Sequence, residues 1–135
     1  VKRWTAHVDG AARGNPGPAG IGIVIEDGEG NTVKEIGEPL GRTTNNVAEY
    51  TALIRALEEA RALGCDALDI YTDSELMAHQ LSGHYAVKAP HLRPLFDRAR
   101  CLLRQFASAS ISHVRRERNR RADALSNIGA DQVKG

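Results

Sequence analysis

The sequence has few cysteines and aromatic residues, and it contains no long apolar run. The two cysteines, Cys65 and Cys101, do not have metal-ligand spacing, and a chain of 135 residues does not need a disulfide to fold. No stretch approaches the roughly 18 apolar residues of a membrane span, and no secretory leader is recognisable. We therefore expect a cytoplasmic protein that has no membrane partner, and we also expect a monomer.

An excess of one charge is also absent. The formal net charge is +1, so whole-chain electrostatics do not indicate nucleic-acid binding. Five arginines are nevertheless concentrated between Val114 and Asp123, although such a run is equally typical of a solvated helix start. The length and the hydrophobic content of 41% fit a single domain over residues 1–135.

The apolar pattern switches between strand and helix periods. Strands are predicted at residues 3–8, 21–27, 32–40, 67–73 and 109–114. Helices are predicted from Tyr50 to Gly64, over 74–81, from Pro90 or Pro94 to Phe106, and over 119–130. Residues 10–20 are rich in glycine and proline and predict a loop. The order βββαβααβα implies an α/β fold with a five-stranded mixed sheet, three antiparallel strands plus two parallel ones, flanked by helices.

Acidic residues stand at four junctions of these elements. Asp9 follows the first strand, Asp73 ends the fourth, and Glu49 and Asp123 lie near the starts of the first and last helices. In this topology the two strands are neighbours at the sheet centre, and both helices reach the same end of the sheet. Carboxylates in one pocket repel each other, and hard divalent cations bound through oxygen remove that repulsion. The pattern therefore predicts a carboxylate site for Mg²⁺.

Each acid also has an ordinary structural interpretation. Asp9 can form an Asx turn, and Glu49 lies at capping-box spacing from Asn46. Asp73 can be an N-cap, and Asp123 can complement the dipole of the last helix. Each alternative is reasonable alone, whereas a metal site accounts for all four positions together.

Four segments, DGAARGNPGPAG, TTNNVAEY, YTDSEL and NRRADALSN, resemble type 1 ribonuclease H in this order and at these separations. The resemblance covers essentially the whole chain, and it is closest to the compact bacterial and archaeal branch that lacks the basic protrusion. It implies that Asp9, Glu49, Asp73 and Asp123 are catalytic and bind two Mg²⁺ ions, for which Mn²⁺ can substitute. It also implies an endoribonuclease that hydrolyses the RNA strand of RNA–DNA hybrids, leaving 5′-phosphate and 3′-hydroxyl ends.

The resemblance further implies contacts with the hybrid. The glycine-rich loop and the Asn45–Asn46 pair would touch the RNA strand and its 2′-hydroxyls, and a pocket for a DNA phosphate would lie nearby. The implied substrate-binding residues are Gly10, Ala11, Ala12, Arg13, Gly14, Asn15, Arg42, Thr44, Asn45, Asn46 and Lys88. The structural alternatives are a tight turn for the loop, helix capping for the two asparagines, and solvated side chains for Arg42 and Lys88.

One departure from the family pattern concerns histidine. Many members carry a histidine in the loop before the last helix, but no histidine lies between Val114 and Asp123 here. We expect an arginine to take over part of its role, with Arg118 the first choice and Arg115 the second. A guanidinium does not deprotonate at neutral pH, so it would bind phosphate and not shuttle protons.

The alternative to an enzyme is a non-cleaving module of the same fold that binds RNA–DNA hybrids or structured RNA. Loss of a carboxylate would favour that reading, and all four are present. Two further alternatives are a related nuclease acting on DNA junctions or ends, and an unrelated phosphatase using the same metals. The GNPG and TTNN loops argue against both.

Overall fold

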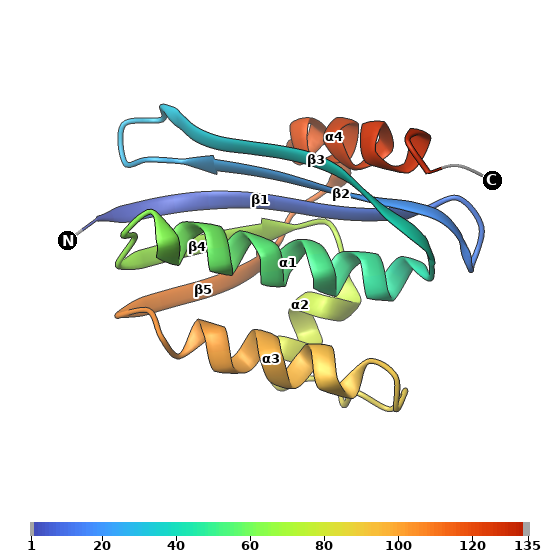
Figure 1. The fold of residues 1–135 in the computed structure, drawn as a ribbon. Coiled ribbons are helices and arrows are strands. Elements are labelled where there is room, and N and C mark those ends of the chain that lie inside the picture. Colours follow the sequence, from blue (N-terminus) through green and yellow to red (C-terminus); the bar gives the residue numbers. More distant parts are fainter. Residues whose placement is uncertain (1, 134–135) are drawn as a thin grey trace.

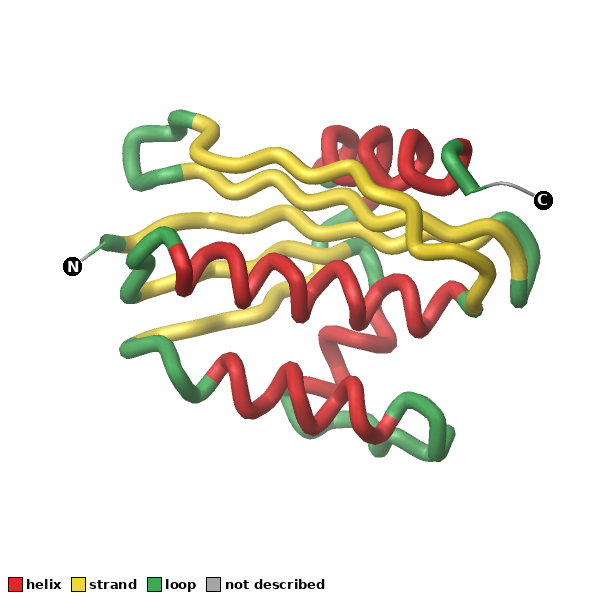
Figure 2. The backbone as a smooth tube through the Cα atoms, viewed as in Figure 1, coloured by secondary structure: helices red, strands yellow, loops and turns green. Residues whose placement is uncertain are grey.

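A computed structural model describes residues 2–133 of the chain. The strands are β1 (Arg3–Ala12), β2 (Gly17–Glu26), β3 (Thr32–Thr43), β4 (Ala67–Thr72) and β5 (Ser108–His113). The helices are α1 (Asn45–Ala62), α2 (Glu75–Leu81), α3 (Arg93–Leu103) and α4 (Arg120–Asp131), and a short 3₁₀ turn (Arg116–Arg118) precedes α4. The predicted order βββαβααβα is confirmed (Figures 1 and 2).

The sheet has the strand order β3-β2-β1-β4-β5, so β1 lies at its centre. β1, β2 and β3 pair antiparallel, whereas β4 and β5 continue the sheet in parallel with β1. This is the predicted mixed sheet, and it is confirmed. α1 packs along β1 and β2 on one face, with α3 against α1, and α4 covers β1, β2 and β3 on the other face (Figure 1).

The apolar core lies between the sheet and the layer of α1 and α3. Ile21, Ile23 and Ile25 of β2 contribute to it together with Leu53 and Leu57 of α1, and all five are at most 2% exposed. Burial of such side chains provides about 1.5–3 kcal/mol each. Among residues 2–133, no helix is long and apolar enough to cross a membrane.

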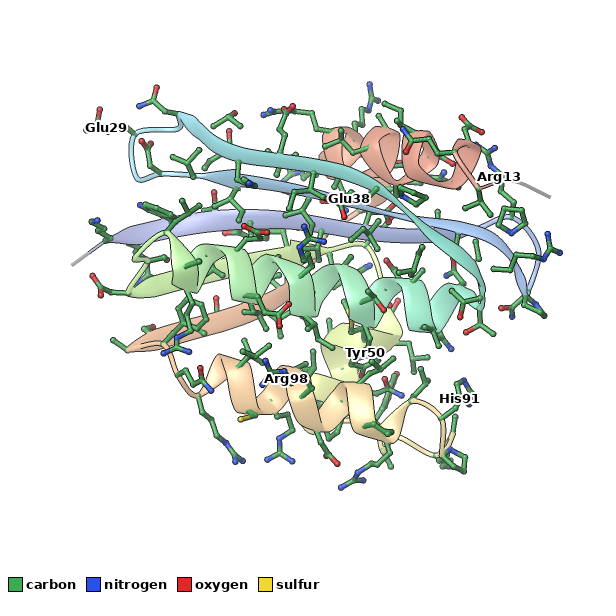
Figure 3. All side chains as sticks on the ribbon, in the orientation of Figure 1. Arg13, Glu29, Glu38, Tyr50, His91 and Arg98 are labelled. Carbon is green, nitrogen blue, oxygen red and sulfur yellow. The ribbon has the colours of Figure 1, made fainter. Side chains whose placement is uncertain are left out.

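Tyr50 connects the core to the helical layer near the sheet end. It projects from α1 toward α2 (Figure 3), and its hydroxyl donates to Gln80 Oε1 at 2.6 Å. Both side chains are buried, and burial raises the pKa of Tyr50 to about 12. The hydrogen bond satisfies two polar groups that would otherwise be costly to bury.

The loop predicted over residues 10–20 is wrong in extent, because β1 continues to Ala12 and β2 begins at Gly17. Two of the four glycines in this segment make room for helices. A Cβ at Gly10 would lie 2.1 Å from the backbone carbon of Ala48 in α1, and one at Gly20 would lie 2.2 Å from the backbone oxygen of Ser126 in α4. Only the turn at 13–16 remains, where Gly14 has a φ of 101° that favours glycine.

Candidate active site

The end of the β1–β4 pair positions two of the four acids. Val8 and Thr72 form the last parallel pair, so Asp9 is the next residue of β1 and Asp73 directly follows the end of β4. β4 ends at Thr72, and Ser74 then caps α2 by accepting a hydrogen bond from the Met77 amide at 3.2 Å. The N-cap is therefore Ser74 and not Asp73, which leaves the Asp73 carboxylate available beside Asp9.

Glu49 reaches the same place from α1. The N-cap of α1 is Thr44, whose hydroxyl accepts from the Val47 amide at 3.3 Å, so the capping-box interpretation of Glu49 does not hold. Glu49 is buried, and its Oε1 accepts a hydrogen bond from the Gly10 amide at 2.5 Å. The bare backbone of Gly10 allows α1 to approach β1 closely enough for this bond.

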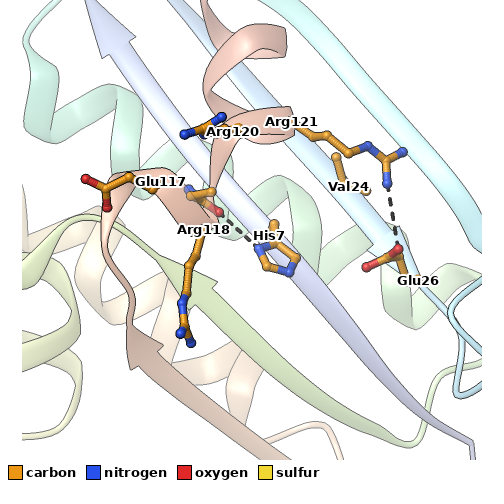
Figure 4. A pocket seen from close by; sticks show the side chains of 8 residues that line it. His7, Val24, Glu26, Glu117, Arg118, Arg120 and Arg121 are labelled. Atoms are coloured by element: carbon orange, nitrogen blue, oxygen red, sulfur yellow. Dashed lines mark hydrogen bonds and ion pairs between the residues drawn. The ribbon is translucent and has the colours of Figure 1, made fainter.

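Asp123 comes from the opposite face, in the first turn of α4. The start of this helix is fixed by Asn119, which is 1% exposed. Its side-chain Nδ2 donates to the carbonyl oxygen of Val8 at 2.9 Å, and its Oδ1 lies 3.1 Å from His7 Nδ1 (Figure 4). The same asparagine that precedes α4 therefore anchors the helix to β1 one residue before Asp9.

Three of the carboxylates form a compact group. Asp9, Glu49 and Asp73 each offer an oxygen atom within 4.8 Å of the others. Asp123 lies outside this group but lines the same cleft as the other three. The structure thus brings all four predicted acids to one end of the sheet, with Asp9 at the centre.

The charges in this cleft are poorly compensated by the protein. Burial, together with the Asp73 and Asp123 carboxylates, raises the pKa of Asp9 to about 8, and a hydrogen bond from Ser126 only partly opposes this. Burial and the neighbouring Asp9 charge raise the pKa of Glu49 well above its usual value. Oxygen donors held together in this way suit a hard divalent cation, which would restore the charged forms.

The predicted substrate residues surround this cleft unevenly. Gly10, Ala11 and Asn45 line it directly. Asn45 Oδ1 accepts from the Ala12 amide at 3.3 Å, and the Asn45 amide donates to Asn15 Oδ1 at 3.2 Å. These bonds tie the turn of β1 and β2 to the start of α1, so the two predicted RNA-contacting segments form one surface.

The remaining predicted contacts lie farther from the acids. Arg13 is paired with Asp131 at the end of α4. Arg42 is exposed near the end of β3, and Thr44 serves as the N-cap of α1. Lys88 is exposed in the loop between α2 and α3. Gly14, Asn15 and Asn46 are exposed beside the cleft-lining residues in sequence.

The arginine nearest the carboxylates is one that the sequence did not single out. Arg116 Nη2 lies 3.3 Å from Asp123 Oδ1, and Arg116 lines the cleft. Arg118 and Arg115 instead line a separate hollow with His113 and Glu117. In Figure 4, Arg118 lies next to His7. A 3₁₀ turn rotates successive side chains by about a third of a turn, so residues two apart point in different directions.

Comparison with known proteins decides the family. A family model described as reverse transcriptase-like matches residues 7–129. Ribonuclease HI of Halobacterium salinarum is 50% identical over 97% of this chain. Ribonuclease H of Dechloromonas aromatica is 35% identical and aligns over 94% of this chain and 93% of its own length. The chain belongs to the ribonuclease H family.

Solved ribonucleases H share the fold closely. The crystal structure of RNase H1 from Halobacterium salinarum matches with a TM-score of 0.93 and 49% identity, covering 97% of this chain and 99% of that one. LC11-RNase H1, isolated from compost and solved in complex with an RNA/DNA hybrid, matches with a TM-score of 0.89 and 44% identity, covering 96% and 97%. The chain spans 66% of the length of the curated Halobacterium relative and 35% of a bifunctional protein of Mycobacterium tuberculosis.

Two residues that support this site do not stand out in the sequence as functional. The sequence predicts Asn119 only as a helix start, and it predicts no role for Ser126. Ser126 Oγ donates to Asp9 Oδ2 at 2.5 Å. A signal for it existed, because Ser126 lies three residues after Asp123 and therefore on the same face of α4.

Proposed function

We propose that the chain is an endoribonuclease that hydrolyses the RNA strand of RNA–DNA hybrids and leaves 5′-phosphate and 3′-hydroxyl ends. The observation that carries this proposal is the convergence of four carboxylates in one cleft of a ribonuclease H fold. The substrate assignment is supported by LC11-RNase H1, a relative that was solved with an RNA/DNA hybrid.

We propose two Mg²⁺ ions as the cofactor, with Mn²⁺ as a substitute. Asp9, Glu49 and Asp73 would hold one ion, and Asp9 with Asp123 would hold the other. The fit rests on the oxygen donors and on the buried negative charge that raises the pKa of Asp9 and Glu49. When bound, such ions would supply an activated water and neutralise charge on the leaving 3′ oxygen.

The chain's own residues would bind and orient the hybrid. The Gly10 backbone holds the Glu49 carboxylate, and the small residues Gly10 and Ala11 allow a sugar–phosphate backbone to approach the acids. Asn45 lines the same cleft, where its side-chain amide would contact the RNA strand. The outer contacts of Arg42, Thr44 and Lys88 would then serve the DNA strand.

Arg116 replaces Arg118 as our choice for the arginine that acts in place of the missing histidine. Its side chain is 73% exposed, so its ion pair with Asp123 contributes little to stability and leaves the guanidinium accessible. From this position it can bind an oxygen of the scissile phosphate and offset the charge that develops there. It would not move a proton, because a guanidinium stays charged.

We also propose that residues 1–135 act as a single ribonuclease H domain, which is monomeric and cytoplasmic. Support comes from the single core shared by the sheet, α1 and α3. The free thiols of Cys65, which is buried, and Cys101, which is exposed, suit a reducing compartment.

The test compares short end-labelled RNA–DNA, RNA–RNA and DNA–DNA duplexes in Mg²⁺ and in Mn²⁺. We expect metal-dependent internal cuts confined to the RNA strand of the hybrid. Asp9→Asn should bind the hybrid but not cut it, because it weakens metal capture and spares the contact loops. Tight hybrid binding by the wild type without cutting in either metal would favour the binding module, and normal turnover by Asp9→Asn would refute the metal assignment.

A further inference from the structure

Ser126 links two of the four acids although it carries no charge itself. It lies on α4 and is fully buried. Its hydroxyl is 2.5 Å from Asp9 Oδ2 and 2.8 Å from the backbone oxygen of Asp123. A buried hydroxyl between one acid's side chain and another acid's backbone is placed to control their relative position.

The fold brings Ser126 to Asp9 through the glycines of β2. Asp9 pairs with Gly22, so both residues face α4 from adjacent strands. A Cβ at Gly22 would lie 2.6 Å from the Ser126 amide nitrogen, and one at Gly20 would lie 2.2 Å from the Ser126 carbonyl oxygen. The helix backbone therefore rests directly on β2, and the short serine side chain can reach across to β1.

The hydroxyl has a single hydrogen for two acceptors. Ser126 Oγ lies within hydrogen-bond distance of Asp9 Oδ2, at 2.5 Å, and this bond becomes charge-assisted once Asp9 is ionised, because a carboxylate is the stronger acceptor. This bond occupies one lone pair of Oδ2 and restricts rotation of the carboxylate about its Cβ–Cγ bond. The other oxygen of Asp9 then keeps a fixed direction in the cleft, where Glu49 and Asp73 offer their oxygens.

We propose that Ser126 is a positioning residue that orients Asp9 for divalent-cation binding. The inference deepens the proposed function, because it assumes that the four-acid cleft is a metal site. It extends to α4 a principle of metal centres, that hydrogen bonds to a ligand fix its orientation and tune its affinity. It also gives α4 a second task besides supplying Asp123.

The test measures Mn²⁺ binding to the whole, substrate-free chain by isothermal titration calorimetry. We expect Ser126→Ala to weaken Mn²⁺ binding by about tenfold, the scale for loss of a partner that supports a metal ligand. The Mg²⁺ concentration for half-maximal cleavage should rise in parallel, and saturating Mg²⁺ should restore much of kcat. Asp9→Asn is measured alongside, and the heat of Mn²⁺ binding that it loses is the part that belongs to this site.

Thr51→Ala is the matched control. Thr51 donates its hydroxyl to the Val47 carbonyl at 2.7 Å within α1, so this variant also removes a hydroxyl bonded to helix backbone, but it leaves Asp9 untouched. Its Mn²⁺ affinity should equal that of the wild type. If circular dichroism shows that Ser126→Ala does not fold, Ser126→Cys is measured in its place, because a thiol keeps the volume and donates only weakly.

Unchanged Mn²⁺ affinity in the folded Ser126 variant would overturn the proposal and reduce Ser126 to a packing residue. The outcome is separable from that of the proposed function. A chain that binds Mn²⁺ in a Ser126-dependent way but cuts no hybrid retains the positioning role and loses the ribonuclease assignment. A chain that cuts hybrids but binds Mn²⁺ independently of Ser126 retains the ribonuclease assignment and loses the positioning role.

Discussion

Asp9 combines burial with a negative charge, and the two are in conflict until a cation is present. It is 4% exposed and lies among three other carboxylates. Burial raises its pKa to about 8 from an ordinary value of 3.8. The buried acids therefore suit a metal ion but lower the stability of the metal-free protein, as is common at functional sites.

This conflict predicts a pH dependence of stability in EDTA. Between the unfolded pKa of 3.8 and the folded pKa of about 8, the folded state holds a proton on Asp9 that the unfolded state has lost. The free energy of unfolding should therefore fall as pH rises through this window. Asp9→Asn should flatten the fall and raise Tm near the upper end of the window by about 5 °C, as measured by thermal melts. Parallel pH profiles for the two proteins would contradict the assignment.

A pair of arginine variants tests which side chain serves the scissile phosphate. Arg116 contacts Asp123 in the cleft, whereas Arg118 lines a different hollow. Arg116→Ala should lower kcat by about tenfold or more, since it would remove the positive group that we propose beside the scissile phosphate. Arg118→Ala carries the same charge change and should alter kcat far less. A larger loss in Arg118→Ala would return the role to that residue.

At the scale of single elements, the close packing of α4 on the sheet depends on the glycines beneath it. A Cβ at Gly22 would lie 2.0 Å from the backbone oxygen of Ala122, and this backbone cannot rotate away as a side chain can. The helix must therefore lift from β2 if Gly22 gains a side chain. Asp123 and Ser126 would move with it, so the glycine acts on the metal site through packing alone.

Gly22→Ala should consequently destabilise the protein by about 3 kcal/mol or more in urea unfolding, at the upper end of overpacking costs. It should also weaken Mn²⁺ binding. Gly28→Ala is the control, because a Cβ there has a single neighbour within 4 Å, the Arg3 carbonyl oxygen at 3.3 Å, and it should change stability by less than about 1 kcal/mol. Equal effects of the two substitutions would show that α4 tolerates displacement.

The sequence predicted the element order and the four acids because both leave local signals. Periodicity marks strands and helices, and Asp9 and Asp73 stand where such periods end. It misjudged residues 10–20, because glycine marks turns and close packing alike, and only the approach of α1 and α4 distinguishes the two. Arg118 is a related case, since the direction of a side chain in a short turn depends on its tertiary contacts, and it is Arg116, not Arg118, that lines the cleft of the acids.

At the scale of the whole molecule, the net charge is only +1, so the electrostatics of hybrid binding depend on which arginines lie near the acids. Arg116 and Arg120 share a hollow with Asp123 at the cleft. Arg104 lies just after α3, close to the start of β5, and β4 and β5 run in parallel from that end toward the acids. A polyanion that reaches the acids would therefore meet Arg120 and remain distant from Arg104.

Hybrid binding should accordingly weaken as salt is added, because each phosphate that the protein neutralises releases counterions. A plot of the logarithm of the association constant against the logarithm of the salt concentration should have a slope of about −3 to −5. The measurement uses Asp9→Asn in Mg²⁺, so that the hybrid stays intact between about 50 and 200 mM salt. Arg120→Ala should make the slope shallower by about one unit, whereas Arg104→Ala should leave it unchanged. Equal slopes for both variants would place the hybrid elsewhere on the surface, since only contacts with phosphate contribute to the slope.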